Sequence, residues 1–335
     1  MSAAPSEVRL PDWSRLSPTG VGLVAWFLLA AGSLGLTLAF GWAEDSPLEL
    51  RFWRDARGWF DVVALSGLFG WTVGGSVALV RGARRDLEAL RPALDPDTAL
   101  PEVDRFPRRS LWSVTACGVV LGITINAAPA QWPGGFPGIG HPFFLWASLR
   151  TTLIVCAICL TGVIATSLAR RFSRLGRELR LDLLDLRPLA PLGRCGLRSV
   201  AVWAGISAIL AIMLLAPFGR SVNAGAIAGS AVIGVVAFLG PVRGARKRLI
   251  EIRDGELARV RAALGARLDG VSVSDARLAK LTLTDLLAWE QRVERVRTLP
   301  FDASTVLRFG LYVAIGLGSW IGAALVERAL GAALG

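Results

Sequence analysis

The sequence predicts an all-α protein, a polytopic bundle of about seven transmembrane helices with a small helical hairpin on the cytoplasmic side. Two observations predict this fold class. The chain of 335 residues is 53% hydrophobic and only 19% charged, with a mean hydropathy of +0.53, which excludes an ordinary soluble domain. In addition, several apolar runs approach the roughly 20 residues with which a helix crosses the hydrocarbon layer.

The distribution of charge predicts the orientation of these spans. With a cytoplasmic amino terminus, seven spans place 31 of the 37 lysines and arginines, and 20 of the 26 acidic residues, on the cytoplasmic side. This asymmetry is what the positive-inside rule requires. Residues 1–19 lack the pattern of a signal peptide, so the first apolar run is expected to be a retained span. We therefore expect a multi-pass membrane protein with a cytoplasmic amino terminus.

Three spans are expected in the first half of the chain, over residues 20–43, 61–80 and 111–130. The second contains Gly70-x-x-x-Gly74, a spacing that lets another helix approach closely. The loop at residues 131–141 is uncharged and rich in proline and glycine. It lies at the interface or re-enters the membrane, and the sequence leaves both alternatives open.

The fourth span, residues 142–169, is the clearest, because it ends at a dense group of arginines. Beyond the arginines we expect the same helix to continue as an interfacial amphipathic helix over residues 171–187. Pro188 and Pro191 then predict a non-helical elbow, with the fifth span beginning near Leu197. The fifth and sixth spans are expected at residues 197–215 and 224–240.

The chain is accordingly divided into three parts. Residues 1–241 form the bundle of spans one to six, with the interfacial helix. Residues 242–303 form the cytoplasmic helical hairpin, in which Ser274 and Thr284 are predicted N-caps. Residues 304–335 hold the seventh span, at about 306–325, and a short outer tail.

Two stretches in the second half of the chain carry a resemblance. They are Asp185-Leu186-Arg187-Pro188-Leu189-Ala190-Pro191-Leu192-Gly193-Arg194, and Leu299-Pro300-Phe301-Asp302 followed by Leu307-Arg308-Phe309-Gly310-Leu311-Tyr312. With them the chain resembles uncharacterised multi-pass inner-membrane proteins of GC-rich bacteria. The resemblance implies a location and a fold class, and it assigns no activity and no functional residue.

Arg150 is the principal candidate for a pore or ligand role, because it is a charge within the apolar run of the fourth span. An ionisable residue at such a position is a functional hypothesis by default. Asn126 and Asp61 are its candidate partners at similar depth. The alternative is an arginine whose long side chain reaches the outer headgroups.

Eight basic residues are predicted to lie at one depth near the cytoplasmic surface, and we call them the basic collar. They are expected to face anionic lipid headgroups or a cytoplasmic vestibule. The basic collar consists of Arg81, Arg84, Arg85, Arg170, Arg171, Arg243, Arg246 and Lys247. Because the excess of positive charge lies at the membrane, no nucleic-acid partner is predicted.

The sequence gives no support for catalysis or for a cofactor. It contains no phosphate-binding loop, no zinc-protease motif and no nucleophile elbow. One histidine and four scattered cysteines predict no metal site, and Cys156 and Cys159 are expected to be small packing residues rather than a redox pair.

Two functions from different classes remain. The first, slightly favoured, is a homo-oligomeric channel or facilitator for an ion or small solute, with a water-accessible path lined by Arg150 or Asn126. The second is a non-conducting scaffold or sensor that presents the hairpin at 243–303 to a cytoplasmic protein partner. The second predicts tightly packed spans and an exposed apolar stripe on the hairpin.

Overall fold

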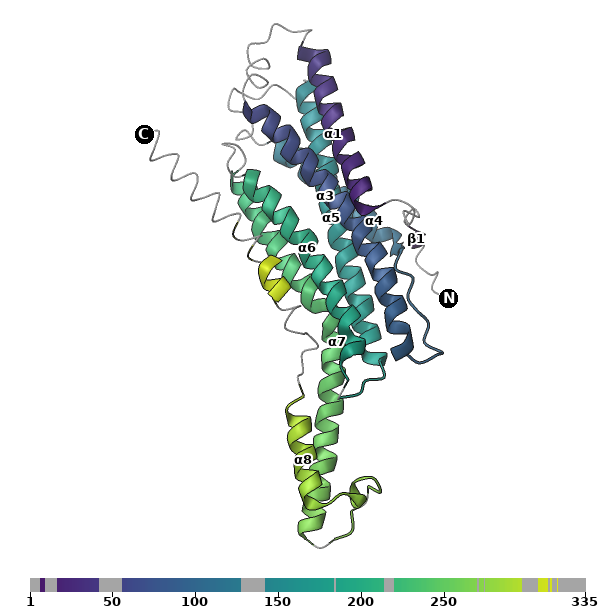
Figure 1. Ribbon diagram of the computed structural model, residues 1–335. Helices are drawn as coiled ribbons and strands as arrows, with labels where there is room; N and C mark the ends of the chain where they lie inside the picture. The colour runs from purple at the N-terminus through teal and green to yellow at the C-terminus, as the bar shows by residue number, and fades with distance from the viewer. Residues whose placement is uncertain are drawn as a thin grey trace, which may run out of the picture.

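The computed structural model describes nine ranges and two single residues of the chain. They are residues 7–9, 17–41, 56–127, 142–183, 185–213, 220–269, 271–273, 275–296 and 307–312, with 314 and 318. Within them the protein is an elongated bundle of α-helices from which a helical arm projects (Figure 1). The all-α fold class is therefore confirmed.

Helices α1 (Pro18–Gly41) and α3 (Ala56–Leu90) pack directly against each other through glycine. A Cβ atom on Gly70 would lie 2.5 Å from the carbonyl oxygen of Gly22, and one on Gly74 would lie 2.8 Å from that of Pro18. Backbone atoms cannot give way at such distances, so only glycine permits this contact. The predicted close approach at Gly70 and Gly74 is confirmed, with α1 as the partner.

Helices α4 (Arg108–Ala127) and α5 (Pro142–Glu178) pack in the same way. Gly118 lies against Cys156, and Gly122 lies against the backbone of Thr152. A Cβ atom added to Gly122 would lie 2.7 Å from the Cα of Thr152. The pairing of 118 with 156 and of 122 with 152 shows that the two helices run antiparallel. Much of the remaining surface of α4 consists of exposed apolar side chains.

The predicted continuation of the fourth helix beyond the arginines is present, but it is shorter than the predicted range of 171–187. α5 continues through the arginines and ends at Glu178, because arginine, leucine and glutamate are good helix formers. The chain then turns through an isolated bridge between Asp182 and Asp185 and a 3-10 turn, η4 (Arg187–Leu189).

The elbow predicted around Pro191 is also wrong. Helix α6 (Ala190–Met213) begins seven residues before the predicted start at Leu197. Pro191 lies in its first turn, where the backbone nitrogen has no intrahelical acceptor and proline is tolerated. α6 therefore reaches further toward the charged end of the bundle than the hydropathy alone indicates.

Helix α7 (Arg220–Leu268) is the longest element, with 49 residues and Pro241 inside it. Its first half packs against α6, where Gly196 contacts the carbonyl oxygen of Phe238. It also packs against α5, where Gly244 contacts the carbonyl oxygen of Ser173. Its second half leaves the bundle as one side of the projecting arm (Figure 1). The boundary predicted at residue 242 thus falls within a single helix.

We call residues 249–296 the arm. Helix α8 (Leu283–Glu294) packs against α7 around a small core of Val260, Leu264, Leu278 and Leu286. A 3-10 turn, η5 (Leu278–Lys280), precedes it. α8 starts at a capping box in which Thr282 and Asp285 satisfy each other's backbone N–H groups. The N-cap is therefore Thr282 and not Thr284; Ser274 lies outside the described residues.

Six helices in the described residues are long and apolar enough to cross a membrane. They are α1, α3, α4, α5, α6 and the first part of α7, so the chain is a multi-pass membrane protein. Exposed large apolar side chains on α1, such as Phe27 at 64%, are explained by contact with lipid. The predicted seventh span lies mostly outside the described residues, and the total of seven stays a prediction.

Candidate functional site

The charged end of the bundle contains a buried ion pair between α3 and α6. Asp86 is 3% exposed, and its carboxylate accepts a hydrogen bond of 3.0 Å from Arg198. Arg194, one turn earlier on α6, lies 3.5 Å from the second carboxylate oxygen. Because removal from water makes an isolated charge very costly, the two arginines are what allows Asp86 to be buried.

Gly82 makes room for this ion pair. A Cβ atom at position 82 would lie 2.0 Å from the guanidinium of Arg198, which crosses α3 at that point. Gly82 is one turn before Asp86, so the glycine and the acid lie on the same face of α3. This group of Gly82, Asp86, Arg194 and Arg198 was not predicted from the sequence. A signal was available, since Arg198 lies just inside the predicted fifth span.

A second group of contacts ties the segment between α3 and α4 to the bundle. This segment holds the turn η2 (Arg91–Ala93) and strand β2 (Arg105–Pro107), which pairs antiparallel with β1 (Glu7–Arg9). Arg84 forms a 3.0 Å ion pair with Asp104. Arg171 donates to the carbonyl oxygens of Glu102 and Arg105, with its guanidinium 5.3 Å from the centre of the Phe106 ring.

The basic collar is divided by these contacts. Arg81, Arg84 and Arg171 are half-buried, and the last two bind the segment before α4. The other five members are exposed: Arg85, Arg170, Arg243, Arg246 and Lys247. The members of the basic collar lie on α3, α5 and α7. These helices are connected near the collar by close contacts of Gly82 with Arg198 of α6, of Gly196 of α6 with Phe238, and of Gly240 with Ala169. The orientation toward anionic lipid stays a prediction.

Arg150 and Asn126 lie on two helices that pack against each other, but Arg150 lies on the side of α5 away from the contact with α4. The buried side chain of Asn126 follows Gly118 and Gly122 on the face of α4 toward α5, and it donates to the carbonyl oxygen of Gly122 at 2.9 Å. Thr152 faces α4, and Arg150, two positions earlier, is about 160° away around the helix. Arg150 is half-buried. Asp61 belongs to α3, but its side chain lies outside the described residues.

The interior of the bundle is closely packed where the described helices meet. Large apolar side chains in its middle are almost fully buried, among them Leu68, Ile164, Leu168 and Ile206. The hydroxyls of Ser76 and Thr161 hydrogen-bond between α3 and α5 at 2.8 Å, and those of Ser207 and Ser230 do so between α6 and α7 at 2.6 Å. These hydroxyls bind one another, so they hold helices together.

An open hollow of about 560 Å³ lies where α5 ends beside α7. Its charged side chains are balanced between three basic and three acidic residues, so it does not select a ligand by charge. Its lining consists of Asp95, Arg177, Glu178, Leu179, Arg180, Leu181, Asp182, Arg248 and Ile252. Arg180 in this lining forms an ion pair with Asp95, which closes the segment before α4 onto the end of α5.

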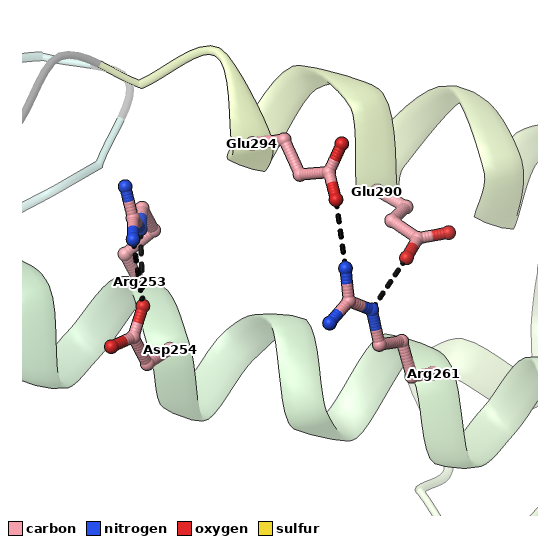
Figure 2. A network of polar contacts seen from close by, with 5 residues as sticks. All are labelled: Arg253, Asp254, Arg261, Glu290 and Glu294. Atoms are coloured by element: carbon pink, nitrogen blue, oxygen red, sulfur yellow. Dashed lines mark hydrogen bonds and ion pairs between the residues drawn. The ribbon is translucent and has the colours of Figure 1, made fainter.

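The two helices of the arm are fastened by a branched ion pair. Arg261 on α7 donates to Glu290 and Glu294 on α8, both at 2.7 Å (Figure 2). Trp289 donates from its indole to Glu256 at 3.3 Å. With the core beneath, these contacts fix α8 against α7.

Among the described residues, no group of three or more His, Cys, Asp or Glu side chains could hold a metal ion. Cys195 is buried, and Cys156 directs its thiol toward the carbonyl oxygen of Thr115 at 3.8 Å. Neither a protein-family model, nor a curated protein, nor a solved structure matches this chain. The resemblance to inner-membrane proteins of GC-rich bacteria therefore stays an expectation.

Proposed function

We propose that this protein is a membrane-embedded scaffold or sensor that presents the arm to a protein partner on the cytoplasmic side of the bacterial inner membrane. One observation carries the proposal. α7 runs as a single helix of 49 residues from the bundle into the arm, so the position of the arm is fixed relative to the membrane. A loop could tether a domain, whereas an unbroken helix holds it in one direction.

The packing of the bundle supports this function over conduction. The described spans meet through glycine contacts, hydroxyl pairs and fully buried aliphatic side chains. A pore would instead require polar groups that line a wet path. The cytoplasmic location of the arm rests on the charge asymmetry of the sequence, and the exposed members of the basic collar are then placed to bind anionic headgroups.

The channel or facilitator predicted from the sequence is the second candidate. The half-buried Arg150, within an apolar stretch of α5, favours it. In such a protein the path would form between the chains of a homo-oligomer, with Arg150 facing it.

Two measurements separate the candidates. A photo-crosslinking amino acid at an exposed arm position, Ala288, should give discrete protein adducts in cells, whereas one at Val236 in the exposed apolar part of α7 should give none. Purified protein in liposomes should leave ion and small-solute flux at the background of protein-free vesicles. Flux that exceeds this background and is lost in Arg150→Leu would replace the scaffold with the channel.

A further inference from the structure

Four arginines gather on three helices where α4 begins, and we call them the arginine cluster. It consists of Arg108 of α4, Arg170 and Arg174 of α5, and Arg243 of α7. All four side chains are exposed. None of them takes part in an ion pair within the described residues, and Glu178, the acidic residue of α5, pairs with none of them. The arginine cluster therefore carries positive charge that no described side chain neutralises.

The side of α5 that packs against α4 continues into the arginine cluster. Cys156 meets α4 at Gly118, where the two helices run antiparallel. Arg174 follows Cys156 by five full helical turns, so both residues project to the same side of α5. Arg170 lies one turn before Arg174 and shares that side.

Helix α4 begins too late to cover these two arginines. Counted along both helices from their antiparallel contact, its first residue, Arg108, lies opposite residue 166 of α5. Arg108 is also two turns before Thr115, whose carbonyl oxygen faces the thiol of Cys156, so it lies on the side of α4 toward α5. The α5 arginines begin one turn beyond residue 166. Arg108 thus lies beside them at the charged end of the bundle.

Helix α7 brings Arg243 to the same place. α5 and α7 run parallel in close contact, with Gly244 against the carbonyl oxygen of Ser173. In parallel helices, a residue that follows a contact position on one helix and a residue that precedes it on the other project to the same side of the contact. Arg174 follows Ser173, and Arg243 precedes Gly244. The two arginines therefore lie together on one side of the pair.

The arginine cluster adjoins a surface that contacts lipid tails. Trp112, one turn into α4, is 63% exposed. On α7, Leu239 and Val236 lie one and two turns before Arg243, on the same side of the helix, and they are 51% and 55% exposed. Cations without an acidic partner thus continue directly from exposed apolar side chains. A phospholipid matches this order, with its phosphate against the cations and its acyl chains against the apolar surface.

From this arrangement we infer that the arginine cluster binds the headgroup phosphate of an individual anionic phospholipid, whose acyl chains lie along Leu239 and Val236. Guanidinium groups bind phosphate oxygens in a bidentate manner, so arginine suits this ligand better than lysine. The site is narrower than the basic collar, because Arg108 and Arg174 are not members of the collar. The inference goes beyond the proposed function, since it assigns a ligand to the bundle and requires nothing of the arm.

The test uses the full chain in micelles of a non-ionic detergent. The probe is phosphatidylglycerol with a fluorescent acyl chain, whose binding is followed by energy transfer from tryptophan. Unlabelled phosphatidylglycerol should displace the probe at a concentration at least about tenfold lower than phosphatidylcholine with the same acyl chains. Inorganic phosphate at millimolar concentration should not displace it, because it lacks the apolar part of the ligand.

Substitutions within the arginine cluster locate the binding site. Arg174→Gln with Arg243→Gln should weaken binding of the probe by about tenfold or more, since each cation near a headgroup adds to the attraction. Both side chains are exposed, so the protein should keep its fold, which circular dichroism verifies. If the double variant loses helix, the two single variants replace it, and each should weaken binding by about threefold or more.

Two other arginines provide the matched control. Arg85 and Arg246 are exposed members of the basic collar, but they point away from α5. Arg85 lies about 180° around α3 from Ser76, which bonds to α5, and Arg246 lies about 160° around α7 from Gly244. Arg85→Gln with Arg246→Gln removes the same charge and should weaken binding by less than about twofold.

Three results would overturn the inference. Displacement of the probe by phosphatidylcholine as readily as by phosphatidylglycerol would show that the headgroup charge is not recognised. Displacement by millimolar inorganic phosphate would assign the arginine cluster to a soluble anion. An equal loss of affinity in the Arg85 and Arg246 variant would mean that the whole charged surface attracts lipid and that no individual site exists.

Discussion

Gly82 is the residue on which the contact between α3 and α6 depends most directly. An alanine there would put its Cβ 2.0 Å from the Arg198 guanidinium. Since this group is the end of a flexible side chain, the guanidinium rather than the helix would move, and Asp86 would lose its nearest cation. Breaking a buried ion pair from one side costs about 3 kcal/mol or more.

Gly82→Ala is therefore expected to lower the free energy of unfolding about as much as Arg198→Met. Because both act on one interaction, the double variant should cost little more than either alone. Unfolding in mixed micelles by titration with dodecyl sulfate measures these free energies. Lys247→Ala removes an exposed ion pair in which Lys247 and Glu251 are 4.0 Å apart. It should lower the free energy of unfolding by less than about 1 kcal/mol. Additive costs for Gly82→Ala and Arg198→Met would show that the glycine has a separate role.

Asp285 makes the stability of the first turn of α8 dependent on pH. The Thr282 hydroxyl and backbone N–H donate to its carboxylate and lower the pKa of Asp285 below its ordinary value of 3.8. A lowered pKa in the folded state means that the stabilisation is present above the unfolded pKa and is lost as pH falls through the folded pKa. α8 should thus be unaffected between pH 7 and 5 and should fray below about 4. Amide hydrogen exchange in α8 measures this. Asp285→Asn should remove this pH dependence. If α8 in the variant frays with the same pH profile, the Asp285 carboxylate is not its cause.

At the scale of elements, the sequence allowed the spans to be predicted better than the lengths of the helices. The helix of the fourth span was expected to continue beyond the arginines to residue 187, and α6 was expected to start at Leu197. α5 instead ends at Glu178, and α6 starts at Ala190, because Pro191 lies in a first turn. The Asp86 ion pair was not predictable from spacing alone, since it joins two helices more than 100 positions apart.

The contact between α4 and α5 should be sensitive to substitution of the glycine that faces α5, Gly122. Gly122→Ala would place a Cβ 2.7 Å from the Cα of Thr152, and backbone cannot yield, so a loss of about 1–3 kcal/mol is expected. Gly67→Ala on α3 is the matched control, because nothing lies within 4 Å of its Cβ position. It should be neutral or slightly stabilising. The same micelle titration compares them, and equal effects would contradict the close contact between Gly122 and Thr152.

At the scale of the whole molecule, the proposed presentation of the arm depends on α7 as one rigid connection between the membrane bundle and the arm. Pro241 lies inside this helix, and a proline can bend a helix or break it. The helix around Pro241 packs against α5 and α6, as the contacts of Gly240 with Ala169 on α5 and of Phe238 with Gly196 on α6 show. This packing supports a continuous helix at the point where the proline would otherwise weaken it.

The most direct measurement is a distance across this boundary. Spin labels at Leu239→Cys, exposed in the apolar part of α7, and at Ala262→Cys, exposed in the arm, are introduced after the four native cysteines are replaced. A helix that rises about 1.5 Å per residue puts these positions about 35 Å apart. In nanodiscs, double electron–electron resonance should give one narrow distribution near that distance. A broad distribution, or a main distance shorter than about 25 Å, would mean that the arm is not held by a continuous α7, and it would contradict the proposed presentation of the arm.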